Sequence, residues 1–298
     1  MPADAPKPMA WPEGATLLLG IGAQKAGTTW LHAYLRDHPA CTSGPMKELH
    51  YFDGLGGDLK LGNRLRAEAL KRARANPKGG LRVSRLERLQ ATCEAPDPDH
   101  AGYLSVVATG RLAPGKVALD FTPEYALVPD AVFQQMAALP GARLIFLMRE
   151  PVARFWSAVR MRAAKMVEQG EDFETCARGV LDEMLAQGNT GAHLRSDYVT
   201  TLDKLQRLVP IEQRLVLFFE DLFVQETVDA VCAFLGIAPR AIDAAQPRNE
   251  GQRAEMRPDQ VAALTALLRP QYEMVNQLCG GNLPQAWHAR FAARANVA

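Results

Sequence analysis

The chain has 298 residues, of which 48% are hydrophobic and 22% charged, and its formal net charge is only +1. This size allows one large domain or two modest ones, and the near-neutral charge by itself favours no class of partner. Five widely spaced cysteines exclude a small disulfide-stapled domain and favour reduced thiols in a cytoplasmic protein, and no cysteine–histidine group has the spacing of a zinc site.

The first predicted elements follow a short leader. Residues 1–14 are rich in proline and carry no apolar signal core, so we expect a disordered leader before a single domain at 15–298. Residues 15–22 form a continuous apolar run of strand length, as in a strand buried on both faces. Helical spacing of apolar residues follows at 28–38. No apolar run approaches 18 residues, so no transmembrane helix is expected.

The rest of the chain alternates between strand and helix patterns. Residues 54–111 interrupt this alternation with helical, strand-poor sequence, which we interpret as a helical insertion. The remaining predicted elements are, in chain order, strands at 116–121 and 142–150, a helix at 151–166, a strand at 214–222, and helices at 224–236 and 258–278. Strands that alternate with helices indicate an α/β fold, in which helices flank a parallel sheet.

A glycine-rich loop joins the first strand to the first helix. In GAQKAGTT, four residues separate Gly22 from Gly27, and hydroxyl groups follow at Thr28 and Thr29. Backbone amides of such a loop and of the helix N-terminus face an anion, and Lys25 adds a point charge. The alternative is a tight turn with an incidental lysine.

The position of the lysine separates two functional classes. A P-loop NTPase carries lysine directly after the second glycine, where this chain has Thr28. A magnesium-dependent kinase would use Thr29 and Asp120 to hold the metal. The strand at 142–150 ends near Arg149 rather than an acid, which suits an anion bound without metal. A third reading is a nucleotide- or membrane-binding module without turnover.

Four segments together resemble one enzyme family. QKAGTTWL (24–31) resembles the 5′-phosphosulfate loop of the sulfotransferases that use 3′-phosphoadenosine 5′-phosphosulfate, and LIFLMREPVARFWSAVRM (144–161) resembles their second signature. MKELHYFD (46–53) and DFTPEY (120–125) are similar to elements of the heparan-sulfate-type branch. The resemblance spans about 15–235 and implies a P-loop-like sheet of about five parallel strands. It also implies metal-free transfer of a sulfuryl group to a hydroxyl or amine.

The resemblance implies a set of nucleotide-binding residues. At the 5′ end these are Lys25, Ala26, Gly27, Thr28, Thr29 and Trp30. At the 3′-phosphate they are Arg149 and Ser157, since an arginine fork and a hydroxyl suit a phosphate. A late loop, in which Gly251 and Arg253 are candidate contacts, closes over the nucleotide in this family. We assign Arg154, Arg160 and Arg162 to the solvated face of a helix.

The segment 46–53 supplies the candidate chemistry. We take Glu48 as the base that removes the proton of the acceptor, so that activity falls at acid pH, and Lys25 as the group that stabilises the leaving phosphate. His50 would orient the acceptor or serve as the alternative base. The candidate acceptor contacts are Lys47, Phe52, Thr122 and Tyr125. The alternatives are that Lys47 and Glu48 are surface charges and His50 a satisfied polar residue, and that Thr122–Tyr125 is a turn set by Pro123.

The charge is unevenly distributed. Residues 60–90 hold ten Lys/Arg and two Asp/Glu, a local net of +8 in a chain of +1. Such a segment contacts an anionic membrane or an anionic acceptor, or it is simply a solvated helix face. We expect it to frame the acceptor entrance, with Arg72 and Arg74 affecting the KM for the acceptor. No interleaved aromatic residues indicate a nucleic-acid partner. Carbohydrate, lipid head group and small metabolite all stay open as acceptors.

Overall fold

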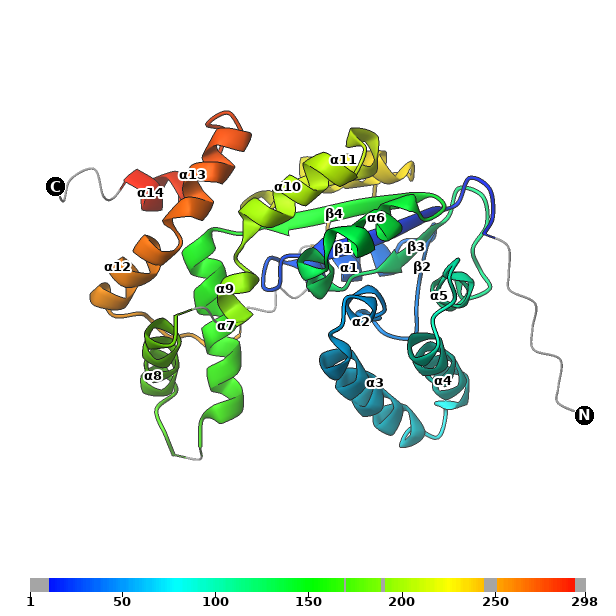
Figure 1. The fold of residues 1–298 in the computed structure, drawn as a ribbon, viewed down its shortest axis with the longest axis horizontal. Coiled ribbons are helices and arrows are strands. Elements are labelled where there is room, and N and C mark those ends of the chain that lie inside the picture. Colours follow the sequence, from blue (N-terminus) through cyan, green and yellow to red (C-terminus); the bar gives the residue numbers. More distant parts are fainter. Residues whose placement is uncertain (1–10, 169, 189–190, 244–250, 293–298) are drawn as a thin grey trace, which may run out of the picture.

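The centre of the molecule is a five-stranded, all-parallel sheet (Figure 1). Its strands are β1 (Thr16–Gly22), β2 (Cys41–Ser43), β3 (Val117–Asp120), β4 (Ala142–Met148) and β5 (Arg214–Phe218). Their order across the sheet is β2-β3-β1-β4-β5, so β1 lies between β3 and β4. The structure is a computed structural model that describes residues 11–168, 170–188, 191–243 and 251–292. It confirms the predicted α/β fold.

Continuous apolar runs form the four strands that the sequence predicted. In β1, Leu17, Leu18 and Leu19 are fully buried, and β4 buries every residue except Arg143. A strand covered by helices on both faces needs apolar side chains on both faces. The strand that we did not predict, β2, has three half-buried residues and therefore no comparable run.

Helices pack against the sheet and extend it at both ends (Figure 1). In chain order they are α1 (Thr28–Arg36), α2 (Phe52–Leu55), α3 (Leu59–Arg74), α4 (Gly80–Glu94), α5 (Ala101–Ala108), α6 (Asp130–Ala138), α7 (Pro151–Met166), α8 (Phe173–Ala186), α9 (Gly191–Leu194), α10 (Tyr198–Leu208), α11 (Gln225–Leu235), α12 (Pro258–Leu267), α13 (Arg269–Leu278) and α14 (Gln285–Ala292). In Figure 1, α10 and α11 lie above the sheet and α2–α5 lie below it toward the right. The helices α7, α8 and α12–α14 gather on the left of the view.

The stretch 54–111 is helical in the structure, since α3, α4 and α5 occupy most of it. Its helices α3 and α4 have a small apolar cluster of their own, made by Ala69, Ala73 and Leu86. None of the helices among the described residues is both long and apolar enough to cross a bilayer.

Predicted boundaries were wrong in the leader, in the helix expected at 258–278 and in the strand expected at 214–222, which ends at Phe218. The helix expected at 258–278 is divided into α12 and α13 at Leu268, because Pro270 has no amide hydrogen and its ring crowds the preceding turn. In the expected leader, residues 1–10 lie outside the described residues. Trp11 is not part of a disordered leader: it is half-buried against the main core, and its indole donates to the Ala15 carbonyl at 3.2 Å.

Candidate active site

The loop between β1 and α1 has a backbone that few sequences could adopt. Lys25 and Gly27 have φ values of 70° and 91°, in the left-handed region. A Cβ at Gly27 would lie 2.6 Å from Leu222 Cδ2 and 2.9 Å from Phe219 Cδ2. Only glycine therefore fits at the point where α1 begins, and the loop passes close beneath the segment after β5.

The backbone of this loop offers several hydrogen-bond donors to a ligand. Within the part of the chain that the structure describes, the amides of Lys25, Gly27, Thr28 and Thr29 have no hydrogen bond to a protein acceptor. The first amides of a helix lack an intrahelical partner, and their dipoles favour negative charge. Ala26 is fully buried, so only its backbone is available. The loop is thus built to receive an anion.

Two arginines hold the loop in place, Arg149 just after β4 and Arg154 in α7. Arg149 Nη1 donates to the Lys25 carbonyl at 3.2 Å, and Arg154 Nη1 donates to the Gln24 carbonyl at 3.3 Å. Arg154 also donates to the Ser196 hydroxyl and is fully buried. Our assignment of Arg154 to a solvated helix face was therefore wrong: its guanidinium is enclosed because it binds backbone and hydroxyl oxygens inside the fold.

The two predicted anion sites lie in one cavity of about 900 Å³. Lys25, Thr28 and Thr29 line it from the loop, while Arg149 follows β4 and Ser157 lies in α7. This follows from the parallel sheet, in which the carboxyl ends of neighbouring strands β1 and β4 meet at the same edge.

Aromatic rings form one wall of the same cavity. Trp30, Phe219 and Phe223 line it, and the Trp30 and Phe223 rings meet edge to face at 5.0 Å. The Arg149 guanidinium lies 4.4 Å from the centre of the Phe219 ring. This contact fixes the plane of the guanidinium while leaving it on the cavity surface.

The cavity concentrates positive charge. Burial, together with the nearby charges of Arg149, Arg160 and Lys47, lowers the pKa of Lys25. Arg160 lines the cavity and donates to the Gln252 carbonyl at 2.9 Å, so assigning it to a solvated face was also wrong. Cations that crowd one another in this way are stabilised by an anionic ligand.

Of the two residues predicted to contact the nucleotide from the late loop, only one lies at the cavity. Arg253 lines the cavity, whereas Gly251 is exposed and is not among the lining residues. Arg162 is exposed on α7 and lies 3.8 Å from Glu183, as expected for a solvated helix face. The late loop therefore reaches the cavity through Arg253 and through the carbonyl bound by Arg160.

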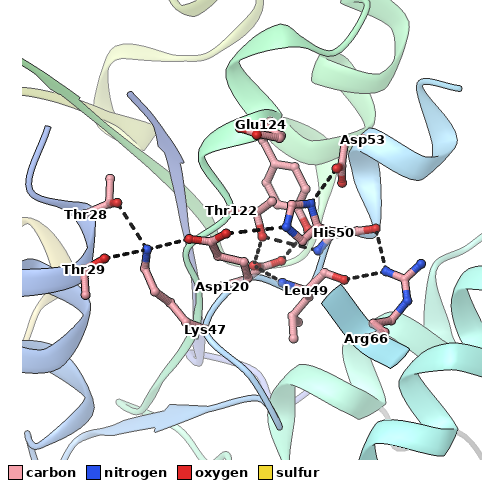
Figure 2. Close-up of polar contacts among 12 residues, drawn as sticks. Thr28, Thr29, Lys47, Leu49, His50, Asp53, Arg66, Asp120, Thr122 and Glu124 are labelled. Atoms are coloured by element: carbon pink, nitrogen blue, oxygen red, sulfur yellow. Dashed lines mark hydrogen bonds and ion pairs between the residues drawn. The ribbon is translucent and has the colours of Figure 1, made fainter. Parts of the chain in front are cut away.

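Lys47 joins the candidate base to the phosphate loop. Its Nζ lies 3.3 Å from Thr28 Oγ1, 3.1 Å from Thr29 Oγ1 and 2.8 Å from Glu48 Oε1. Figure 2 shows its ammonium directed at the two threonines. We expected Lys47 on the acceptor side, but it faces the loop as well.

Glu48, His50 and Asp53 form a line of hydrogen bonds and ion pairs. His50 Nδ1 lies 2.7 Å from Asp53 Oδ2, and His50 Nε2 lies 3.5 Å from Glu48 Oε2 (Figure 2). Burial alone would lower the pKa of His50, but these carboxylates raise it to about 9. Burial alone would raise the pKa of Glu48, but His50 and Lys47 lower it to about 2. The histidine is therefore a cation and Glu48 an anion at neutral pH.

Three predicted acceptor contacts are buried instead. Phe52, Thr122 and Tyr125 are each fully buried, so they do not face a cleft. Phe52 packs among the rings of Tyr51, Tyr103 and Tyr125. Apolar packing, rather than ligand contact, explains why this aromatic residue stands next to Glu48 and His50.

Asp120 is the anchor around which these residues gather. Its Oδ1 accepts from the Thr122 hydroxyl at 2.7 Å and from the Leu49 amide at 3.4 Å. Its Oδ2 accepts from the hydroxyls of Tyr125 at 2.7 Å and Tyr103 at 2.9 Å. The carboxylate is fully buried and surrounded by donors, so Asp120 does not reach the cavity as the kinase reading requires. Across 11–292, apart from the undescribed positions, no three His, Cys, Asp or Glu side chains form a metal-binding group.

Two positioning residues were missed in the sequence. Asp53 ends the segment 46–53, but a carboxylate three residues after His50 also looks like an ordinary helix-start acid. Arg66 was counted among the basic residues of 60–90, yet it is fully buried and donates to the Leu49 and His50 carbonyls at 3.0 and 3.1 Å (Figure 2). Nothing in its local pattern separates it from its exposed neighbours.

Comparisons with known proteins identify a family and a similar fold. A sequence model described as "Sulfotransferase family" matches residues 18–240, while no curated protein matches significantly. The fold is similar to a sulfotransferase from Alicyclobacillus acidocaldarius, with a TM-score of 0.60, 21% identity, and coverage of 94% of this chain and 100% of that chain. A sulfotransferase from Mycobacterium avium is 16% identical over 89% of this chain and 77% of its own, with a TM-score of 0.43.

Proposed function

Because this chain belongs to the sulfotransferase family, we propose that it transfers a sulfuryl group from 3′-phosphoadenosine 5′-phosphosulfate to a hydroxyl or amine. The observation that carries the proposal is the single cavity that contains both the phosphate loop and the pair Arg149 and Ser157. Two separated anion sites suit a nucleotide with a charged group at each end, and the aromatic wall between helices suits a flat purine.

At the 5′ end, the loop amides and the hydroxyls of Thr28 and Thr29 would bind the phosphosulfate. Lys25 would lie against the bridging phosphate and stabilise the charge that develops there. The Lys47 ammonium donates hydrogen bonds to both threonine hydroxyls and to Glu48. An anion bound at the threonines would therefore partly neutralise the positive charge that now stabilises the Glu48 carboxylate. The pKa of Glu48 would then rise, which makes it a stronger base once the donor is present.

The transfer is a displacement at sulfur. The acceptor oxygen or nitrogen forms the new bond to sulfur, and its proton passes to a Glu48 carboxylate oxygen. The bond between sulfur and the bridging phosphate oxygen breaks, and its electron pair stays on the leaving adenosine 3′,5′-bisphosphate. His50 is 1% exposed, and both ring nitrogens face carboxylates, so we assign it the role of positioning Glu48 rather than of touching the acceptor.

The acceptor is proposed to be a carbohydrate, lipid head group or small metabolite. A screen of cell extracts with radiolabelled sulfate donor tests which fraction takes up the label. Label in a single fraction identifies the class, and label in none, with donor bound, contradicts the proposed transfer.

Arg149→Ala tests the donor site by comparing two ligands. It should weaken adenosine 3′,5′-bisphosphate by about 10- to 100-fold, because it removes charge-assisted hydrogen bonds to the 3′-phosphate. Adenosine 5′-phosphate, which lacks that group, should lose much less affinity. Isothermal titration calorimetry with both ligands measures the difference, and Arg162→Ala on the exposed face of α7 is the matched control.

If Arg149→Ala weakens both ligands equally, the arginine acts only by supporting the loop at the Lys25 carbonyl. That result would contradict the assignment of the 3′-phosphate to this residue.

The pH dependence of kcat/KM should have an alkaline limb. The pKa of His50 is raised from 6.5 to about 9, so its cation is complete below 6.5 and is lost as pH rises through 9. Activity should fall along that limb because the neutral His50 ring no longer holds the Glu48 carboxylate in position. The pKa of Glu48 is lowered from 4.5 to about 2, so the acid decline that we expected lies below about pH 3 in the unliganded enzyme.

A profile from pH 5 to 10 checks this expectation. His50→Gln should remove the limb near pH 9, whereas the exposed His288→Gln should keep it. A limb that persists in His50→Gln would mean that another group titrates there.

A further inference from the structure

A second hollow adjoins the donor cavity. It has a volume of about 980 Å³ and shares Thr29, Ala33 and Lys47 with the donor cavity. Six basic residues line it, and none of its described lining residues is acidic. We call it the cationic groove, and its basic residues are Arg36, Lys47, Arg82, Arg85, Arg111 and Lys116.

Elements far apart in the sequence supply these charges. Arg36 ends α1, Arg82 and Arg85 lie in α4, Arg111 follows α5, and Lys116 precedes β3. Figure 1 shows α4 and α5 side by side below the sheet, near β2. The basic residues therefore converge because of the fold, and not because a single run of lysine and arginine happens to be exposed.

Much of this charge lacks an acidic partner. In the described part of the chain, the side chains of Arg82 and Arg111 make neither an ion pair nor a hydrogen bond to protein. Arg85 Nη2 donates to the Ser43 carbonyl at 3.2 Å, and burial and the charge of Arg111 lower the pKa of Arg85. Lys116 Nζ likewise donates only to a carbonyl, that of Pro39, at 3.0 Å.

The other groups that face the groove do not neutralise it. Arg36 pairs with Asp37 at 3.0 Å, but Asp37 is not among the lining residues. Burial, and next the charges of Lys47 and Arg36, lower the pKa of His32 to about 4, so its ring is neutral. Like charges gathered in a hollow repel one another, and an anion relieves that repulsion.

We propose that the cationic groove binds a carboxylate, phosphate or sulfate group of the acceptor, at a distance from the hydroxyl or amine that is sulfated. The inference rests on the proposed function, because Lys47 and its neighbour Glu48 connect the inner end of the groove to the reacting group. Arginines bind such anions through two parallel hydrogen bonds. The acceptor also meets an apolar rim, since Leu81 is 75% exposed and Met46 lines the same hollow.

The proposal narrows our expectation for the basic segment 60–90 to two of its residues. Arg72 and Arg74 do not line the groove, and Arg74 pairs with Glu87 at 2.8 Å. Of the ten basic residues there, only Arg82 and Arg85 face the hollow. A hollow of this kind fits a compact anion better than the flat surface of a bilayer.

Calorimetry with inorganic pyrophosphate tests the proposal. Saturating adenosine 3′,5′-bisphosphate is present throughout, so that the phosphate loop is occupied. The wild-type protein should still bind pyrophosphate, with an affinity that falls as salt is added. The double variant Arg85→Gln, Arg111→Gln should bind it about tenfold or more weakly. Arg88→Gln, an exposed arginine of the same helix α4 outside the groove, is the matched control and should bind as the wild type does.

Three results would overturn the proposal. Pyrophosphate does not bind once the nucleotide is present, or the double variant binds it unchanged, or Arg88→Gln weakens it as much as the double variant does. A membrane source is tested with phosphatidylglycerol and phosphatidylcholine vesicles. The groove would be assigned to lipid head groups instead if three results coincide. The wild-type protein sediments with the anionic vesicles, pyrophosphate releases it from them, and the double variant does not sediment with them.

The same titrations separate this proposal from the proposed function. Failure of adenosine 3′,5′-bisphosphate to bind the wild type contradicts the donor assignment. If the nucleotide binds but pyrophosphate does not, only the proposal for the cationic groove is contradicted. Thermal unfolding of each variant checks that the substitutions leave the fold intact.

Discussion

Glu48→Gln is expected to lower kcat by about 10²- to 10⁴-fold, the usual contribution of a general base. The amide has nearly the same size and still accepts a hydrogen bond from Lys47, but it cannot take a proton from the acceptor. Affinity for adenosine 3′,5′-bisphosphate should stay close to that of the wild type, because the proposed nucleotide contacts are the loop and Arg149 and not Glu48. The rate is measured with the acceptor that the extract screen identifies.

Two controls make this result specific. Glu226→Gln changes an exposed carboxylate of α11 and should leave kcat unaltered. Glu48→Asp retracts the carboxylate from its contacts with Lys47 and His50, and it should fall between the wild type and Glu48→Gln. If Glu48→Gln retains full kcat while binding the nucleotide, proton removal is the task of some other group or of solvent.

The strands and the glycine-rich loop could be predicted because local patterns determine them. A buried parallel strand requires consecutive apolar residues, and β1 and β4 have them. The phosphate loop requires glycine at 27, as its φ of 91° and the close approach of Leu222 show. Arg149 follows the strand that neighbours β1, so the topology alone brings it to the loop.

The surroundings of the candidate base could not be predicted in the same way. Residues at alternate positions of an extended segment point to the same side, and the side chains of Glu48 and His50 are 3.5 Å apart. The segments that resemble the family also made Phe52 and Tyr125 candidate acceptor contacts, whereas both are buried. Whether a residue faces a cleft or the core depends on which distant element covers it. Here Asp120, at the end of β3, accepts hydrogen bonds from the Tyr125 hydroxyl and the Leu49 amide and so draws both segments into the core.

Charge counting failed for a related reason. Residues 60–90 were treated as one basic surface, although Arg66 lies in the interior and Arg85 lines the cationic groove. The exposed Arg72 does neither. A guanidinium is identical in each setting, so only the contacts distinguish a structural arginine from a ligand contact or a solvated one.

Arg66 of α3 connects the helical insertion to the segment that carries the candidate base Glu48. Its Nη1 donates to the Leu49 and His50 carbonyls, while its Nε donates to Gln90 Oε1 at 3.0 Å and its Nη2 to Asn63 Oδ1 at 2.6 Å. His50 has a φ of 54°, a strained conformation for a residue with a side chain. The guanidinium thus secures the backbone on both sides of that strained residue, next to Glu48.

Arg66→Met is therefore expected to reduce both stability and kcat. Methionine keeps much of the apolar stem, but it leaves two buried carbonyls without this donor, at about 1–3 kcal/mol for each unsatisfied group. Chemical denaturation measures the loss of unfolding free energy. Arg64→Met, on the same helix, removes an exposed arginine that lies 3.4 Å from Glu68 and should cost about 0.5 kcal/mol or less.

The effect on kcat separates positioning from mere support of the fold. Once the His50 backbone relaxes, its ring no longer lies between Asp53 and Glu48, so the alkaline limb near pH 9 should shift toward neutral pH. Arg66→Met, assayed at a temperature where it is fully folded, should then show a lower kcat together with this shift. If stability falls while kcat and the pH profile are those of the wild type, Arg66 supports the insertion and has no part in aligning the base. If both change together, the insertion fixes the geometry of the reacting carboxylate as well as lining the acceptor's approach.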